Sequence, residues 1–298
     1  MGGRNVQQSY SKTYLLNQNH FVANVVNDYF NQRLRVDDYR GSVEDLIKEL
    51  VEISEKHSFT KIIVKSHKKD LPIFLAHQFQ LEGIIEKYFS GDDMYFMTKF
   101  LSEKRRKTNS WINEDQIIHD IYNKTRNIKL NEPSKEIMIR RANDEDVEKL
   151  SNLYQKVFTI YPTPLNNPQY ILKTMESGTI YYIAEHKEEI ISAASAEVND
   201  QFHNAEITDC ATLPEYRKHK LMKILILDIE KELLENNIYC VYSIARAQSY
   251  GMNRVLYQLN YKYSGRMKNN CYIFDDIENM NLWCKDLSNY CAEFSAKG

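Results

Sequence analysis

Acidic and basic side chains that could support chemistry are concentrated between residues 205 and 237. Glu206 and Asp209 lie in an alternating, partly β-branched segment, residues 205–212, which predicts a strand. After a Leu-Pro-Glu-Tyr turn come four basic residues at 217–220, and the apolar period then changes to that of a helix ending at Asn236-Asn237. Free N–H groups and the helix dipole attract anions to a helix start. We therefore expect a phosphate site on a cationic first turn; an ordinary β-α unit with a solvated helix start is the alternative.

Composition excludes several classes of protein. The 298 residues are enough for about two domains, and 43% apolar residues can form globular cores. A net charge of −2 and only two short basic runs, at 104–107 and 218–220, argue against nucleic-acid or membrane partners. No run approaches the roughly 18 apolar residues of a spanning helix. Five cysteines without a C-x-x-C pair favour reduced thiols in a cytoplasm over disulfides or zinc, so we expect a cytoplasmic protein without a metal.

Turn and charge signals divide the chain into three parts. Residues 1–103 predict an N-terminal α/β domain, with a helix capped by Ser42, a strand at 61–65, a helix from Leu71 and a hairpin around 90–93. Residues 104–136 predict a linker with one modest helix. Residues 137–298 alternate between strands and helices and predict a second domain with a mixed α/β (α+β) sheet.

The two predicted domains share an internal echo. Residues 59–101 and residues 238–287 both follow the order strand, helix, hairpin, and Phe79 and Gly83 are spaced as Tyr261 and Gly265 are. The N-terminal part is therefore interpreted as a diverged half-copy of the C-terminal fold, with chance similarity as the alternative. It shows no Arg-x-x-Gly-like loop, so we assign it no coenzyme.

The 205–237 segment resembles the acetyl-CoA-binding segment of the GNAT N-acetyltransferases, which reads strand, short turn, Arg/Gln-x-x-Gly-x-Gly/Ala, long helix. Arg217 matches the first motif position, but Lys220 and Met222 stand where the family has small residues. The resemblance implies a GNAT fold for residues 137–298 and acetyl-CoA as co-substrate. The residues it assigns to coenzyme binding are Ala211, Thr212, Arg217, Lys218, His219, Lys220, Leu221, Met222 and Asn253.

The same resemblance suggests catalytic roles. Glu206 matches the family's Glu in Ala-Glu-Ile, and a carboxylate acting through a water can accept the amine proton. Tyr257 loosely matches the tyrosine that protonates the departing thiolate, although a core tyrosine is nearly as good an interpretation. Glu197 and Asp209 lie on neighbouring predicted strands and form either a negative pocket for a cationic substrate or paired surface charges.

A narrower resemblance, to the beta-lysine N6-acetyltransferases, rests on segments in order across residues 60–287. They include Gly91-Asp92-Asp93-Met94-Tyr95, Ser195-Ala196-Glu197, residues 204–212, Ile244-Ala245-Arg246-Ala247, Gly251-Met252-Asn253 and Met280-Asn281-Leu282-Trp283. It implies acetylation of the N6 amine of beta-lysine, which a lysine aminomutase makes, to give a neutral compatible solute. Arg246 is the candidate carboxylate clamp, with pairing to Asp209 as the alternative.

Two other functions stay open. One is acetylation of another small polyamine or lysine-like amine. The other is a non-catalytic acetyl-CoA sensor, which the absence of glycine at positions 218, 220 and 222 favours and the retention of Glu206, Asp209 and Arg246 opposes. Nothing in the sequence indicates an oligomeric state.

Overall fold

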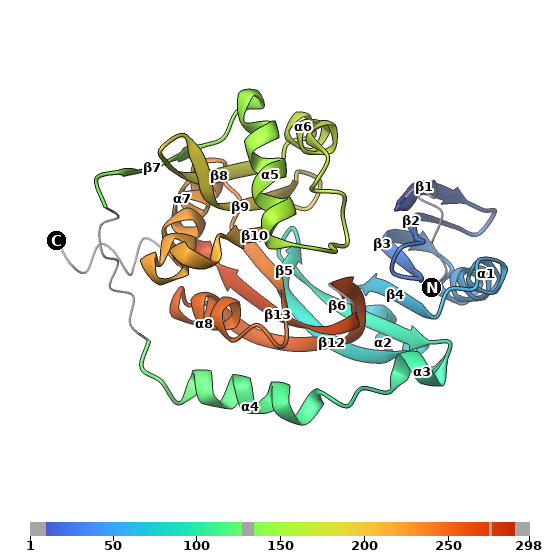
Figure 1. Ribbon diagram of the computed structural model, residues 1–298. Coiled ribbons are helices and arrows are strands. Elements are labelled where there is room, and N and C mark those ends of the chain that lie inside the picture. Colours follow the sequence, from blue (N-terminus) through green and yellow to red (C-terminus); the bar gives the residue numbers. More distant parts are fainter. Residues whose placement is uncertain (1–9, 127–133, 274–275, 290–298) are drawn as a thin grey trace, which may run out of the picture.

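The computed structural model describes residues 10–126, 134–273 and 276–289. Its strands form one sheet of 13 strands in the order β1-β2-β3-β4-β6-β5-β12-β13-β11-β10-β9-β8-β7 (Figure 1). The strands are β1 (Ser11–Asn17), β2 (Phe21–Asp28), β3 (Arg33–Gly41), β4 (Lys61–Ser66), β5 (Gln80–Phe89), β6 (Asp92–Phe100), β7 (Ile137–Arg141), β8 (Ile180–His186), β9 (Glu189–Asn199), β10 (Asn204–Thr212), β11 (Cys240–Arg246), β12 (Lys262–Ile273) and β13 (Asp276–Asp286). The α-helices are α1 (Val43–Lys56), α2 (Leu71–Ala76), α3 (Glu103–Arg106), α4 (Trp111–Tyr122), α5 (Val147–Val157), α6 (Pro168–Glu176), α7 (Leu221–Glu235) and α8 (Tyr250–Gln258), and 3₁₀ turns cover Lys68–Asp70, Asp144–Asp146, Pro214–His219 and Leu287–Asn289.

The N-terminal half, β1 to β6, is a small α/β unit in its own right. Strand β3 pairs in parallel with β4, whereas the other pairs in this half are antiparallel. Helix α1 begins where its sequence predicts, because the Ser42 side chain accepts a hydrogen bond from the backbone N–H of Asp45. Its apolar stripe packs Leu46 and Leu50 into a core with Leu34, Ile62 and Phe74. Strands β2 and β3 are not predicted by the patterns above.

The C-terminal half repeats this plan and extends it. Strands β7 to β10 form an antiparallel meander, and β10 pairs in parallel with β11, as β3 does with β4. Helices α5 and α7 pack against β9 and β10, and their buried residues share one core that includes Leu150, Tyr154, Leu225 and Ile229. The prediction of a mixed α/β fold with an N-terminal half that resembles the C-terminal one is confirmed.

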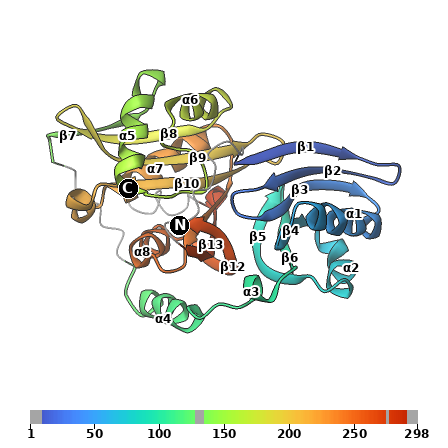
Figure 2. The same ribbon diagram turned by 45° about the vertical axis from the view of Figure 1, so that its right-hand side comes forward.

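The two halves meet at a pair of glycines, which explains why both repeats of the sequence carry a glycine at the same spacing. Strand β5 of the N-terminal half lies beside β12 of the C-terminal half, which joins the halves into one sheet (Figure 2). In this pair Gly83 of β5 lies directly opposite Gly265 of β12. A Cβ on Gly265 would lie 2.3 Å from the Glu82 carbonyl oxygen, and one on Gly83 would lie 2.3 Å from Leu282 Cδ1. A third core is shared across the seam, since Ile63 and Ile85 cluster with residues of β11 to β13.

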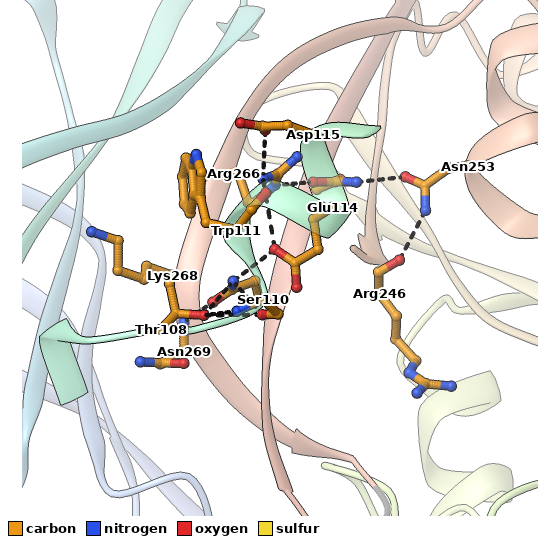
Figure 3. A network of polar contacts seen from close by, with 12 residues as sticks. Thr108, Ser110, Trp111, Glu114, Asp115, Arg246, Asn253, Arg266, Lys268 and Asn269 are labelled. Atoms are coloured by element: carbon orange, nitrogen blue, oxygen red, sulfur yellow. Dashed lines mark hydrogen bonds and ion pairs between the residues drawn. The ribbon is translucent and has the colours of Figure 1, made fainter. Parts of the chain in front are cut away.

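The predicted linker, residues 104–136, contributes α4 and the last residues of α3, and its positions 127–133 lie outside the described residues. Helix α4 is fastened to the C-terminal half by buried Arg266, whose Nη1 donates to Asp115 Oδ1 at 2.8 Å and whose guanidinium lies 4.6 Å from the Trp111 ring centre (Figure 3). Arg266 Nε donates to Asn281 Oδ1 at 2.7 Å, which extends this network toward α8. In the part of the chain that the structure describes, no helix has the length and apolar character needed to cross a bilayer.

Candidate active site

The candidate site lies where β10 and β11 part. Their parallel pairing covers Asn204 to Glu206 of β10. On the other edge of β10, the register with β9 shifts between Thr208 and Ala211, so that Asp209 and Cys210 together oppose one residue. Asp209 adopts the left-handed conformation, with φ of 49°. This bulge interrupts the ladder and turns the Asp209 side chain toward a cavity.

A cavity of about 570 Å³ opens beside the bulge, between β10, β11 and the starts of α7 and α8. A second cavity of about 440 Å³ shares Phe158 and Tyr161 with the first and takes Tyr10 and Phe30 from the N-terminal half. Seven predicted site residues line the first cavity, namely Asp209, Thr212, Arg217, Lys220, Leu221, Met222 and Arg246.

The basic residues precede α7 and do not form its first turn, which corrects the prediction. Pro214–His219 form a 3₁₀ turn, Lys220 is left-handed with φ of 59°, and α7 begins at Leu221. Pro214 explains the early turn, because proline fixes φ and favours such a start. Lys220 thus adopts the left-handed backbone conformation, which glycine would adopt without steric cost. Lys223, which the sequence pattern did not single out, is buried, lines the cavity and follows Lys220 by three positions.

Asp209 is the acidic residue on the cavity wall. Its carboxylate accepts a hydrogen bond from Ser195 Oγ at 3.0 Å, and a second comes from Tyr161. Burial and the nearby Glu197 raise the pKa of Asp209 to about 7, against the opposing effect of these hydrogen bonds.

Glu206 and Glu197 form an acidic pair outside the cavity. Glu206 lies two residues before Thr208, on the same face of β10. They are direct cross-strand partners in β10 and β9, so both side chains leave the sheet on one side. Glu206 is half-buried and Glu197 is exposed, and neither is among the residues that line the two cavities described above. Burial and Glu197 raise the pKa of Glu206 to about 7. Desolvation by the surrounding protein raises the pKa of Glu197 as well, although the positive charges of Arg35 and Lys65 oppose this rise.

Comparison with known proteins identifies the fold and the reaction class. Residues 147–259 match the acetyltransferase (GNAT) family. The N-acetyltransferase YodP of Bacillus subtilis is 45% identical over 260 residues, which cover 87% of this chain and 94% of that protein. The chain belongs to the GNAT acetyltransferase family. Two archaeal relatives are named beta-lysine N(6)-acetyltransferase: that of Methanococcus maripaludis is 36% identical over 86% of this chain and 93% of its own length, and that of Methanosarcina mazei is 34% identical over 84% of this chain and 100% of its own length.

These relatives confirm the resemblance to the beta-lysine N6-acetyltransferase family, and the protein is an N-acetyltransferase. GNAT acetyltransferases take the acetyl group from acetyl-CoA. The first cavity fits such a co-substrate, because Arg217, Lys220 and buried Lys223 supply positive charge beside the N-terminus of α7. Lys218 and His219 are exposed, and Ala211 is buried in the core; a coenzyme contact for these three residues stays a prediction.

Replacing Lys220 tests whether this lysine is a coenzyme ligand. We expect Lys220→Gly to weaken acetyl-CoA binding about threefold to tenfold, because one phosphate contact is lost. The same change should raise the melting temperature by a few degrees, since a non-glycine residue in the left-handed region costs about 1 kcal/mol. Calorimetric titration and thermal unfolding measure the two effects. Lys187→Gly is the matched control, because Lys187 is exposed, is also left-handed with φ of 50° and lies outside the lining of the cavity. It should gain similar stability with no change in acetyl-CoA binding. Tighter acetyl-CoA binding by Lys220→Gly would mean that Lys220 obstructs the loop.

Arg246 lines the coenzyme cavity but already holds a carboxylate of the protein. Its Nε and Nη2 atoms lie 2.8 and 2.6 Å from the two carboxylate oxygens of Glu278. Asp209, which the sequence offered as the alternative partner of Arg246, instead accepts hydrogen bonds from Ser195 and Tyr161. A role for Arg246 as the clamp on the acceptor carboxylate stays a prediction.

Asn253 and Tyr257 lie on parts of α8 that face the protein interior. The Asn253 amide donates to the carbonyl of Arg246 at 2.8 Å (Figure 3). It also donates to the carbonyl of Ser249 at 2.8 Å, and its oxygen accepts from Asn281 and Trp283. These bonds hold the β11–α8 connection. The Tyr257 ring packs 4.8 Å from that of Tyr122 on α4 and lies outside the described lining of the first cavity, which α8 supplies through Gly251, Met252, Val255 and Gln258. Coenzyme contact by Asn253 and proton donation by Tyr257 stay predictions.

Within residues 10–126, 134–273 and 276–289, no group of three or more His, Cys, Asp or Glu side chains is arranged to hold an ion.

Proposed function

We propose that this acetyltransferase transfers the acetyl group of acetyl-CoA directly to the N6 amine of beta-lysine, with Glu206 as the general base acting through a water. The acceptor is suggested by the two relatives named for this activity, which align over most of both chains. The observation that carries the base assignment is a half-buried carboxylate with a pKa of about 7, next to the bulge that borders the coenzyme cavity.

The base is needed because an alkylammonium with a pKa of about 10.4 is almost fully protonated at neutral pH. Glu206 takes one proton from the N6 ammonium by way of the water. The nitrogen lone pair then forms a bond to the thioester carbonyl carbon, and the carbon–sulfur bond breaks. Coenzyme A leaves as a thiolate and takes up a proton, for which Tyr257 is the candidate donor. The acetylated nitrogen gives up its second proton, which restores the tyrosine through solvent, so that the net proton released is the one taken by Glu206. The products are N6-acetyl-beta-lysine and coenzyme A.

The bulge suggests how the thioester is polarised. A carbonyl that gains negative charge is stabilised by a donor held in place beforehand, often a backbone N–H. The interrupted ladder at Asp209 and Cys210 provides backbone at the cavity wall that the β9 register does not use. We place the oxyanion donor there.

The acceptor sets the place of the reaction in metabolism. Beta-lysine must come from an enzyme that moves the amino group of lysine, a lysine aminomutase. Acetylation removes one positive charge and leaves an electrically neutral zwitterion, which suits a compatible solute.

Coenzyme A release from acetyl-CoA by the purified protein tests the proposal, with beta-lysine, α-lysine and spermidine offered in parallel. We expect kcat/KM to be highest with beta-lysine. Preference for spermidine would replace the acceptor by a polyamine. Binding of acetyl-CoA without turnover of any amine tested would favour the sensor function and contradict the proposal.

A further inference from the structure

The N-terminal half turns three charged side chains toward the acidic pair of the acetyltransferase half. Arg35 and Asp37 of β3 form an ion pair with 3.0 Å between Nε and Oδ1, and Lys65 Nζ of β4 lies 3.0 Å from the same oxygen. The exposed fractions of the side chains are 35% for Arg35, 28% for Asp37 and 13% for Lys65, so all three are partly enclosed and still reachable by solvent. We call these residues the β3–β4 triad.

A chain of contacts through Tyr88 and Tyr242 connects the β3–β4 triad to Glu206. Lys65 Nζ donates to the Tyr88 hydroxyl at 2.9 Å, and the Tyr88 ring centre lies 5.7 Å from that of Tyr242. Tyr242 is the parallel-strand partner of Glu206 and makes a hydrogen bond with its carboxyl. Asn204 Nδ2 donates to the Tyr88 carbonyl at 2.9 Å, which fixes the start of β10 on the N-terminal half.

The repeat of the fold explains why these charges meet. In β10 the last residue paired in parallel with β11 is Glu206, the third of three pairs; in β3 the third residue paired with β4 is Arg35. A cation therefore occupies, in one half, the sheet position that the acid occupies in the other. The contacts through Tyr88 and Tyr242 bring these positions of the two halves near each other, and Arg35 and Lys65 accordingly oppose the rise in the pKa of Glu206 and of Glu197.

The charge balance of the β3–β4 triad fits a zwitterion. Burial alone would raise the pKa of Asp37, but Arg35 and Lys65 lower it far below its usual range. Asp37 in turn raises the pKa values of Arg35 and Lys65, although burial opposes this. Two cations therefore share one anion, which leaves one positive charge beside Glu197. A carboxylate next to an ammonium group would be attracted to this combination of charges, whereas a pure polyamine would meet repulsion from the cations.

We propose that the N-terminal half binds the amino-acid head group of the acceptor, with Lys65 and Arg35 holding its carboxylate and Glu197 its second ammonium group, while the reacting amine reaches Glu206. This assignment rests on the proposed function and names the acceptor class, a diamino acid. It also gives the half without a coenzyme loop a role in selecting the substrate.

The test compares beta-lysine with pentane-1,4-diamine, which has the same two amines and lacks the carboxylate. Assays at pH 9 keep Glu206 ionised in every variant, since this pH lies well above its pKa of about 7. We expect Lys65→Met to lower kcat/KM for beta-lysine about 10- to 100-fold, mainly through KM, as truncation of a charge-paired binding residue does. Turnover of the diamine should not fall, because it has no carboxylate for Lys65 to hold and is relieved of repulsion by one cation. Arg35→Met should act in the same direction.

Lys69→Met is the matched control, because Lys69 is exposed and lies four residues from Lys65. Lys65→Arg should restore much of the beta-lysine activity. Equal loss with both acceptors, or no loss with beta-lysine, would overturn the assignment of the β3–β4 triad and leave the proposed function standing. A wild-type protein that acetylates the diamine but not beta-lysine would overturn both.

Discussion

Glu206→Gln is expected to lower kcat with beta-lysine by about 100- to 1,000-fold while acetyl-CoA binding stays unchanged. A positioned general base contributes about 10²–10⁴-fold, and glutamine keeps the shape of the side chain without its proton affinity. Asp209→Asn is the matched comparison, since the pKa of Asp209 is also about 7, but Asp209 is more deeply buried and lies on the cavity wall. We expect that variant to act more on KM. Steady-state kinetics with both substrates separates the two effects; a larger loss of kcat in Asp209→Asn would transfer the base role to Asp209.

The pH profile provides a second readout of the same residue. Below a pKa of about 7 the Glu206 carboxyl is protonated and inactive as a base, so kcat should rise tenfold per pH unit and level off above pH 7. Glu206→Gln should lack this inflection, whereas Asp209→Asn should keep it. An unchanged inflection in Glu206→Gln would contradict the assignment.

Thermal unfolding shows whether the loss of activity reflects misfolding. The folded pKa of Glu206 is raised above its unfolded value of about 4.3, so the folded state binds this proton more tightly and loses stability as pH rises from about 4.3 to 7. Glutamine removes that penalty. The variant should therefore unfold at a higher temperature than the wild type at pH 8, and the difference should shrink at pH 4.5.

Gly265→Ala should destabilise the fold by about 3 kcal/mol, a loss of roughly 5 °C in melting temperature for a chain of this length. Gly265 has φ of 149°, and its Cβ would lie 2.3 Å from the Glu82 carbonyl oxygen and 2.5 Å from Gly83 Cα. Both neighbours are backbone atoms of β5, so relief requires the seam between the halves to open. Thermal and denaturant unfolding measure the loss.

Gly178→Ala separates the cost of a positive φ from the cost of a steric clash with the added Cβ. Gly178 has φ of 95° but no heavy atom within 4 Å of its ideal Cβ, so only the cost of the backbone conformation applies. We expect a loss of about 1 kcal/mol there. Equal effects at the two glycines would show that the close approach of β5 and β12 contributes nothing.

Several features of the molecule follow from short stretches of sequence. The start of α1 at Ser42, the β10–α7 unit and the hairpin of β5 and β6 are determined by capping residues, apolar period and turn residues within about a dozen positions. The spacing of Phe79 and Gly83, repeated at Tyr261 and Gly265, also predicts the duplicated halves. The motif residues around Glu206 and Arg217 predict the family.

Only the tertiary structure decides which side chains share a site. Arg35 and Glu206 are far apart in sequence, and Asn253 is linked to Asn281 through an amide contact that no local period encodes. Strands β2 and β3 escape prediction, and with them the β3–β4 triad. The sequence alone thus determined an acetyltransferase with a repeated α/β plan, because period and motif are local properties. Three features depend instead on how 13 strands align in one sheet. They are the acid that borders the coenzyme cavity, the place of the basic residues before α7, and the position of the N-terminal half opposite Glu206 and Glu197.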